Sequence, residues 1–70
     1  FAFYFFSNEN REPRHVHVRK GDGLLKFWLE PVALADDNGR MKLKELRRAE
    51  ELVNENKERI LKAWNEHFDQ

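Results

Sequence analysis

Two histidines separated by one residue are the strongest candidates for chemistry in this chain. The segment 14–19, Arg-His-Val-His-Val-Arg, alternates polar and apolar residues with the period of two that is typical of a half-exposed strand. On such a strand His15 and His17 lie on one face, about 6.6 Å apart by strand rise, with Val16 and Val18 on the other. Two imidazoles at this spacing can bind one divalent metal ion, because imidazole is a common protein ligand for zinc and similar ions.

A metal site needs a third ligand, and the sequence offers several candidates. Catalytic zinc sites hold the ion with three protein ligands and leave one position open. Glu30 is the best-placed third ligand, whereas Glu9, Glu12 and His67 depend on folding that the sequence does not define. Under this hypothesis the protein is a metal-dependent hydrolase or nuclease.

We favour a structural interpretation of the two histidines over metal binding and over direct acid–base catalysis. In this interpretation His15 lies beside Glu30, and His17 stacks against Trp28 on a solvated sheet face. No catalytic residue is assigned, because Ser7 is the only serine, the chain has no cysteine, and no base accompanies a nucleophile. The candidate site on this face consists of His15, His17, Trp28 and Glu30.

The histidine strand is predicted to be the middle one of three. Residues 1–7 are almost all aromatic, which is typical of a strand that is buried on both faces or covered by a partner. Residues 24–30, rich in bulky side chains, form the third strand after a turn at 21–23. Residues 32–35 either continue along the sheet or pass beneath a helix. We expect the native chain to have further residues before Phe1.

The turn before the third strand determines which side chains share a face. If Asp22 and Gly23 are the central residues of a type I′ turn, Val18 lies opposite Phe27 and His15 lies opposite Glu30. This register keeps the apolar side chains together on the face away from the histidines. They are Val16, Val18, Phe27 and Leu29.

One long amphipathic helix is predicted from Leu43 to Phe68. Its apolar side chains recur at spacings of three, four and seven residues, the pattern of a helix with one buried face. They are Leu46, Ala49, Val53, Ile60, Trp64 and Phe68. Glu55 and Arg59, four residues apart, are predicted to pair. The fold class is therefore α+β: a three-stranded antiparallel meander covered on its apolar face by a long C-terminal helix, in one domain spanning residues 1–70.

The predicted helix is longer than the sheet. As one helix, residues 43–68 span about 39 Å, whereas a strand of seven residues covers about 23 Å. Asn54 and Asn56 interrupt the apolar stripe, so a break with an asparagine cap is the alternative to the continuous helix that we expect. In a continuous helix, the overhanging end with Trp64 and Phe68 packs on a second copy or on another protein.

Five cationic side chains lie near the start of the helix, where the helix dipole favours acidic residues. They are candidates for contact with phosphate or with an acidic partner. We favour a solvated face, on which they pair with Glu45, Glu50 and Glu51. The anion-contact candidates are Arg40, Lys42, Lys44, Arg47 and Arg48.

Composition excludes several classes of protein. The chain has 70 residues, no cysteine, and thirteen basic and thirteen acidic residues, so it has neither a disulfide nor a bulk charge for coating nucleic acid. No apolar run approaches the roughly 18 residues of a membrane span, and the absence of cysteine fits a cytosolic protein. Because so small a core stabilises a fold only marginally, we expect self-association or a protein partner.

The chain resembles the small bacterial family known as domain of unknown function 4160. The resemblance rests on Ser7-Asn8-Glu9, on Glu12-Pro13 leading into His15-Val16-His17-Val18, on Lys26 to Pro31, on Glu55-Asn56 and on Trp64 to Phe68. Arg14 stands where the family commonly has a second proline, and Lys42 where a helix-capping serine is usual. The resemblance implies no established activity. It implies a small protein encoded beside another short protein, an arrangement similar to toxin–antitoxin pairs.

These observations lead to three hypotheses about function. The leading one is a non-catalytic interaction or regulatory module that binds itself or another protein, and the family resemblance implies one component of a toxin–antitoxin-like pair. The rival is the metal-dependent hydrolase or nuclease centred on His15 and His17, and it alone calls for a cofactor, a divalent metal ion. Nucleic-acid binding through the basic cluster is the weakest of the three.

Overall fold

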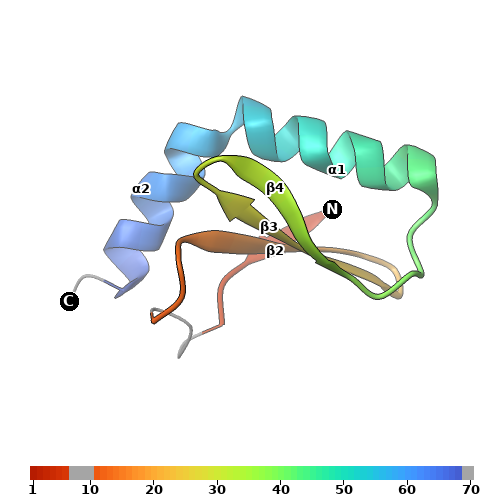
Figure 1. The fold of residues 1–70 in the computed structure, drawn as a ribbon, viewed down its shortest axis with the longest axis horizontal. Helices are drawn as coiled ribbons and strands as arrows, with labels where there is room; N and C mark the ends of the chain where they lie inside the picture. Colours follow the sequence, from red (N-terminus) through yellow and green to blue (C-terminus); the bar gives the residue numbers. More distant parts are fainter. Residues whose placement is uncertain (7–10, 69–70) are drawn as a thin grey trace.

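The computed structural model describes residues 1–6 and 11–68 and has an α+β fold, in which two helices lie over a four-stranded antiparallel sheet (Figure 1). The strands follow one another across the sheet in the order β1-β2-β3-β4. They are β1 (Ala2–Tyr4), β2 (His15–Lys20), β3 (Gly23–Leu29) and β4 (Val32–Asp37), and the helices are α1 (Leu43–Glu55) and α2 (Lys57–Phe68). The α+β class and the antiparallel sheet are confirmed, but the prediction of three strands is wrong.

The fourth strand forms because the chain reverses within two residues after β3. Leu29 pairs with Val32 on either side of Glu30-Pro31, whose peptide bond is cis. Of the two courses left open for residues 32–35, the chain takes the one along the sheet.

The β2–β3 turn lies one residue earlier than predicted. Lys20 pairs with Gly23, so Gly21 and Asp22 are the central residues, and Gly21 has the positive φ (+56°) that the first position of a type II′ turn requires. Gly23 belongs to the strand and lies tightly against Met41. A Cβ atom at Gly23 would lie 2.9 Å from the Cβ of Met41, so the sheet needs glycine there for close packing rather than for a turn.

The change of turn moves the strand pairing by two residues. Val18 lies opposite Leu25 rather than Phe27, and Val16 lies opposite Phe27. Because side chains alternate along a strand, a shift of two residues leaves every side chain on its predicted face. The predicted register is therefore wrong, but the predicted apolar face is confirmed.

The core lies between this apolar face and the two helices. All four apolar residues predicted for the sheet contribute to it, together with Ala49, Val53 and Ile60 of the predicted helix stripe, and Leu25 and Met41 join them. The buried cluster consists of Val16, Val18, Leu25, Phe27, Leu29, Met41, Ala49, Val53 and Ile60, with Leu46 packed against it.

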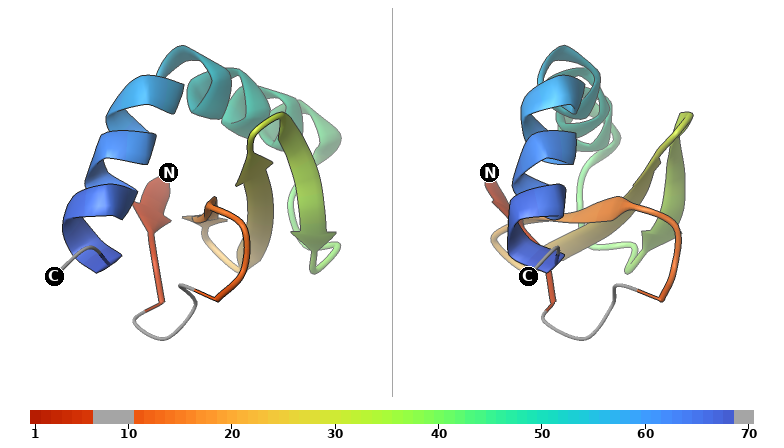
Figure 2. Two further views of the ribbon diagram at one scale, coloured as in Figure 1. Left: turned by 60° about the vertical axis from the view of Figure 1, so that its left-hand side comes forward. Right: turned by 90° about the vertical axis from the view of Figure 1, so that its left-hand side faces the viewer.

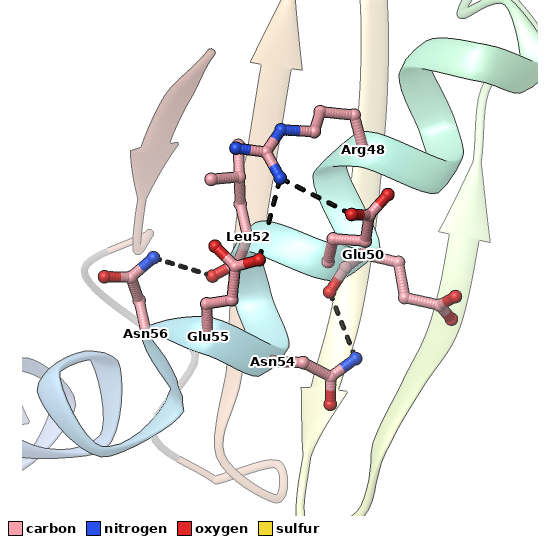
Figure 3. Close-up of polar contacts among 7 residues, drawn as sticks. Arg48, Glu50, Leu52, Asn54, Glu55 and Asn56 are labelled. Atoms are coloured by element: carbon pink, nitrogen blue, oxygen red, sulfur yellow. Dashed lines mark hydrogen bonds and ion pairs between the residues drawn. The ribbon is translucent and has the colours of Figure 1, made fainter.

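The predicted continuous helix is wrong, because the helix is interrupted at Asn56 (Figure 3). The interruption lies at one of the two asparagines for which a break was the alternative prediction. The backbone N–H and the side-chain amide of Asn56 both donate to the carbonyl of Leu52, at 3.0 and 2.8 Å. The Asn54 amide donates to the carbonyl of Glu50 at 3.1 Å. These bonds occupy carbonyls near the end of α1, where a helix runs out of its own donors. The carbonyl of Asn56 accepts the N–H of Ile60 at 2.9 Å and so begins α2.

The bend brings α2 alongside β1 instead of carrying it beyond the sheet (Figure 2). Trp64 is only 5% exposed and packs edge to face on Phe5, with 5.5 Å between ring centroids. Phe68 lies 6.1 Å from the same ring. The predicted overhang of Trp64 and Phe68 is therefore wrong, since both side chains find aromatic neighbours within the chain.

Strand β1 is shorter and more exposed than predicted. It spans three residues and pairs with β2. The nearby rings of Phe1, Phe3 and Phe6 are 43%, 38% and 45% exposed, so the prediction of burial on both faces is wrong. Residues 7–10 lie outside the described residues. They include Ser7, the end of the predicted first strand, and the start of the polar turn.

Candidate functional site

The two histidines share one face of β2, but aromatic side chains cover that face. His15 is fully buried and His17 is 7% exposed. Tyr4, opposite His17 in the sheet, stacks on it with 5.5 Å between centroids, and Phe6 lies 4.5 Å away. Trp64 of α2 lies 4.9 Å from His15. The prediction of a solvated histidine face is therefore wrong, because the rings of Tyr4, Phe6 and Trp64 pack against the two histidines.

A hydrogen bond orients the imidazole of His15. Its Nδ1 lies 2.8 Å from the carbonyl oxygen of Pro13. Because a carbonyl only accepts, Nδ1 carries the proton in the neutral ring, and Nε2 is the nitrogen with a lone pair to offer a metal. That atom is buried, and the rings of Trp28 and Trp64 pack on the imidazole with 5.7 and 4.9 Å between centroids.

The other two predicted site residues lie elsewhere than the sequence indicated. Because of the changed register, the cross-strand partner of His15 is Trp28, not Glu30. The two carboxylate oxygens of Glu30 accept hydrogen bonds from Nε and a terminal nitrogen of Arg14, at 2.8 and 2.9 Å. Trp28 and Glu30 line a hollow of about 640 Å³ that also includes Trp64, but neither histidine lines it. The structure thus divides the predicted site into a buried histidine pair and an open hollow beside it.

No metal centre is assembled in the part of the chain that the structure describes, since no three His, Asp or Glu side chains gather there. Of the further ligands considered, Glu12 forms an ion pair with a lysine and His67 packs among phenylalanine rings. Glu9 lies outside the described residues. Metal binding by His15 and His17 stays a prediction.

The structure also divides the basic cluster. Lys42, Lys44 and Arg48 line one hollow of about 350 Å³, in which Lys20 and Glu45 join them. Arg40 and Arg47 are exposed and do not line this hollow.

Acidic neighbours offset part of this positive charge. The Lys20 ammonium lies 3.0 Å from the Glu45 carboxylate, and the backbone N–H of Lys42 donates to the same carboxylate at 3.1 Å. The hydrogen bonds from Lys20 and Lys42 lower the pKa of Glu45 from its ordinary value. Arg48 lies 3.5 Å from Glu51, as predicted for a solvated face. Contact of the cluster with phosphate stays a prediction.

Sequence reasoning missed a groove between β1 and α2. Its volume is about 410 Å³, and most of its lining is apolar. It is lined by Phe3, Phe5, Val16, Asn56, Arg59, Ile60 and Ala63. A signal was present, because Asn56, Arg59 and Ala63 follow the spacing of one helix stripe. In the predicted continuous helix these residues would not lie next to β1, so the groove was not expected.

None of the described helices has the length and apolar character needed to cross a membrane.

Comparison with known proteins identifies a family. The model of the family described as "Domain of unknown function (DUF4160)" matches residues 1–65 of the 70. The matched part includes all four strands, α1 and most of α2, and so contains both the histidine pair and the groove. No curated protein and no solved structure matches the chain.

Proposed function

The chain belongs to the DUF4160 family, and we propose that it is a non-catalytic protein-binding module whose partner adds an extended segment to strand β1. The family description names no activity, so the proposal depends on the geometry of this chain. The regulatory pair that a toxin–antitoxin-like gene arrangement implies is one form of such a complex.

The observation that carries the proposal is the difference between the two edges of the sheet. Strand β4, at one edge, ends in Asp36 and Asp37, and exposed charges on an edge strand oppose the pairing of a further strand. Strand β1, at the other edge, reads Ala-Phe-Tyr and carries no charge. It carries the exposed ring of Phe3, and the exposed rings of Phe1 and Phe6 lie close to its two ends in the sequence. An apolar edge of this kind supports the addition of a partner strand.

Strand addition would use both the backbone and the side chains of β1. Within the described residues β1 pairs with β2 alone, so alternate backbone groups on its outer side are left for another strand. The hydrogen bonds of an added strand would give affinity, and pockets for alternate side chains would give specificity. Covering the exposed rings would contribute about 25 cal/mol per Å² of apolar surface removed from water.

The end of the helix does not support the proposal. Trp64 and Phe68 were expected to project towards a partner, but they pack on Phe5. The argument for a protein partner therefore depends on β1 and not on the C-terminal helix.

Two equally exposed apolar side chains on opposite edges allow a matched test. Phe3 on β1 is 38% exposed and Leu34 on β4 is 40% exposed. Phe3→Lys places a charge on the β1 edge, and Leu34→Lys is the control on the other edge. The full chain and both variants would be used to capture proteins from the source cells, with identification by mass spectrometry. Sedimentation would measure self-association, and circular dichroism would confirm folding.

We expect the unchanged chain and the Leu34→Lys variant to bind the same partner or to form the same oligomer, and the Phe3→Lys variant to lose it. A monomeric chain that captures the same proteins with and without Phe3→Lys would rule out this function.

A further inference from the structure

The groove between β1 and α2 opens beside the free edge of the sheet. The two elements run side by side in both views of Figure 2. Val16 and Ile60 form an apolar floor and are 1% and 9% exposed, and Phe3 and Phe5 form one wall. Phe3 belongs to β1 and Phe5 directly follows its end, and both side chains line the groove. A strand added next to β1 would direct every second side chain into the same groove.

The wall formed by α2 carries one positive charge. Arg59 is exposed, and its guanidinium forms no ion pair or hydrogen bond with any residue that the structure describes. The predicted pair with Glu55 is not formed, because the helix break at Asn56 lies between the two residues. Glu55 instead lies 3.6 Å from Arg48 (Figure 3). The charge of Arg59 is thus free to meet a ligand.

We infer that the groove selects its partner segment by two side chains: an apolar one over Ala63 and a carboxylate beside Arg59, two residues apart in the segment. The inference rests on the proposed function, since the segment is the strand that adds to β1. Arg59 and Ala63 are four residues apart, which is about 6 Å along α2. Side chains two residues apart on a strand are about 6.7 Å apart. The two spacings match, so one strand can meet both positions.

The chemistry of the groove fits this pair of side chains. Ala63 is small and exposed, which leaves space above it for an aliphatic side chain. The planar guanidinium of Arg59 matches a carboxylate with two parallel hydrogen bonds, and the apolar surroundings strengthen such a charge-assisted contact.

A second copy of the chain does not supply the same pattern through its own β1. Residues 1–8 contain no acidic residue, so these residues of a second copy, paired edge to edge with β1, would not bring a carboxylate to Arg59. The occupant that the groove fits is therefore an extended acidic and apolar segment of a different protein.

Three synthetic peptides, acetylated and amidated at their ends, provide the test. Each has about eight residues and alternates threonine with valine, except for a central Leu-Thr-Glu, Leu-Thr-Gln or Leu-Thr-Lys. Titration calorimetry with the full chain measures their affinities. We expect the glutamate peptide to bind about tenfold more tightly than the glutamine peptide, the effect of one charge-assisted contact. The lysine peptide is expected to bind most weakly.

Variants of α2 identify the side chains responsible. Arg59→Gln is expected to abolish the preference for the glutamate peptide, and Arg59→Glu to transfer the preference to the lysine peptide. Lys62→Gln, which changes an exposed cation outside the groove, is the matched control and should leave the preference intact. Ala63→Phe fills the groove and should weaken all three peptides.

The outcomes separate this inference from the proposed function. Equal affinity for the three peptides, or an unchanged preference in Arg59→Gln, overturns the inference. The proposed function still stands in that case if Phe3→Lys abolishes binding of the partner. A β1-dependent dimer that Arg59→Gln does not affect likewise overturns the inference in favour of a second copy. If no peptide binds and Phe3→Lys changes neither captured proteins nor oligomeric state, both are wrong.

Discussion

The imidazole of His15 and the indole of Trp64 pack edge to face, with 4.9 Å between their ring centroids. One ring comes from the start of β2 and the other from the middle of α2, and they meet because the chain bends at Asn56. The contact links the two features that most suggested function in the sequence, the histidine strand and the overhanging tryptophan. In the folded chain each covers the other, so both contribute to stability.

Trp64→Ala is expected to destabilise the fold by about 3 kcal/mol, because it removes a large side chain that is 95% buried against Phe5 and His15 and leaves a cavity. Urea unfolding followed by far-ultraviolet circular dichroism measures the loss. Leu43→Ala, at a side chain that is 61% exposed, is the control and should change stability by less than about 0.5 kcal/mol. Equal losses in the two variants would mean that α2 does not pack on β1 as described.

Asn56→Ala is expected to lower stability by about 1 kcal/mol, since it removes the side-chain hydrogen bond to the Leu52 carbonyl at the helix bend. Asn54→Ala is the matched comparison. It removes a longer and more exposed bond, and alanine has the higher helix propensity, so its effect should be close to zero. Thermal unfolding of both variants measures the difference. A loss in Asn54→Ala as large as in Asn56→Ala would argue against a special role for Asn56 in the bend.

The features that local periodicity encodes could be predicted from the sequence. The alternation around His15 and His17 placed both histidines on one face, and the helical stripe identified Ala49, Val53 and Ile60 as core residues. Both predictions hold because they depend only on the strand and helix periods, which neighbouring residues determine.

The features that depend on distant contacts could not be predicted. Gly23 packs against Met41, which lies far from it in the sequence, and the burial of the histidine face depends on where Tyr4 and Trp64 lie. The groove was missed for the same reason, since it exists only once α2 has turned towards β1.

Gly23→Ala is expected to destabilise the fold by about 1 to 3 kcal/mol, because the new Cβ would lie 2.9 Å from the Met41 Cβ and 3.2 Å from the Lys20 carbonyl oxygen, neither of which is a flexible end. Gly21→Ala has no atom within 4 Å of the new Cβ and meets only the strain of a positive φ, about 1 kcal/mol. Thermal melting of the two variants ranks them. A smaller loss for Gly23→Ala than for Gly21→Ala would contradict the close packing of Gly23 on Met41.

The ion pair of Glu45 predicts a stability that depends on pH. Its pKa is lowered in the fold, by the hydrogen bond from Lys20 first and by the Lys42 backbone N–H second, from an ordinary value of 4.5. The stabilisation is therefore complete above that value and disappears as the pH falls through the lower pKa of the folded state. The difference in melting temperature between the unchanged chain and Glu45→Gln should be constant at neutral pH and shrink on acidification below about pH 4.5.

Two controls accompany this measurement. Glu45→Gln should have a smaller effect in a Lys20→Met background, and high salt should narrow the difference, since the pair is at the surface. A difference that grows on acidification would contradict the predicted sign.

His15→Ala distinguishes the structural interpretation of the histidines from metal binding. If the imidazole acts by packing against Trp64 and donating to the Pro13 carbonyl, its loss lowers stability by about 2 kcal/mol, or roughly 10 °C in melting temperature, equally with and without zinc. We expect this result, with no rise in melting temperature when zinc is added to the unchanged chain. The opposite result would be a melting temperature that zinc raises in the unchanged chain but not in His15→Ala or His17→Ala, with one zinc per chain by elemental analysis. The buried pair would then be a metal site, because a ligand that binds only the folded state stabilises it by mass action.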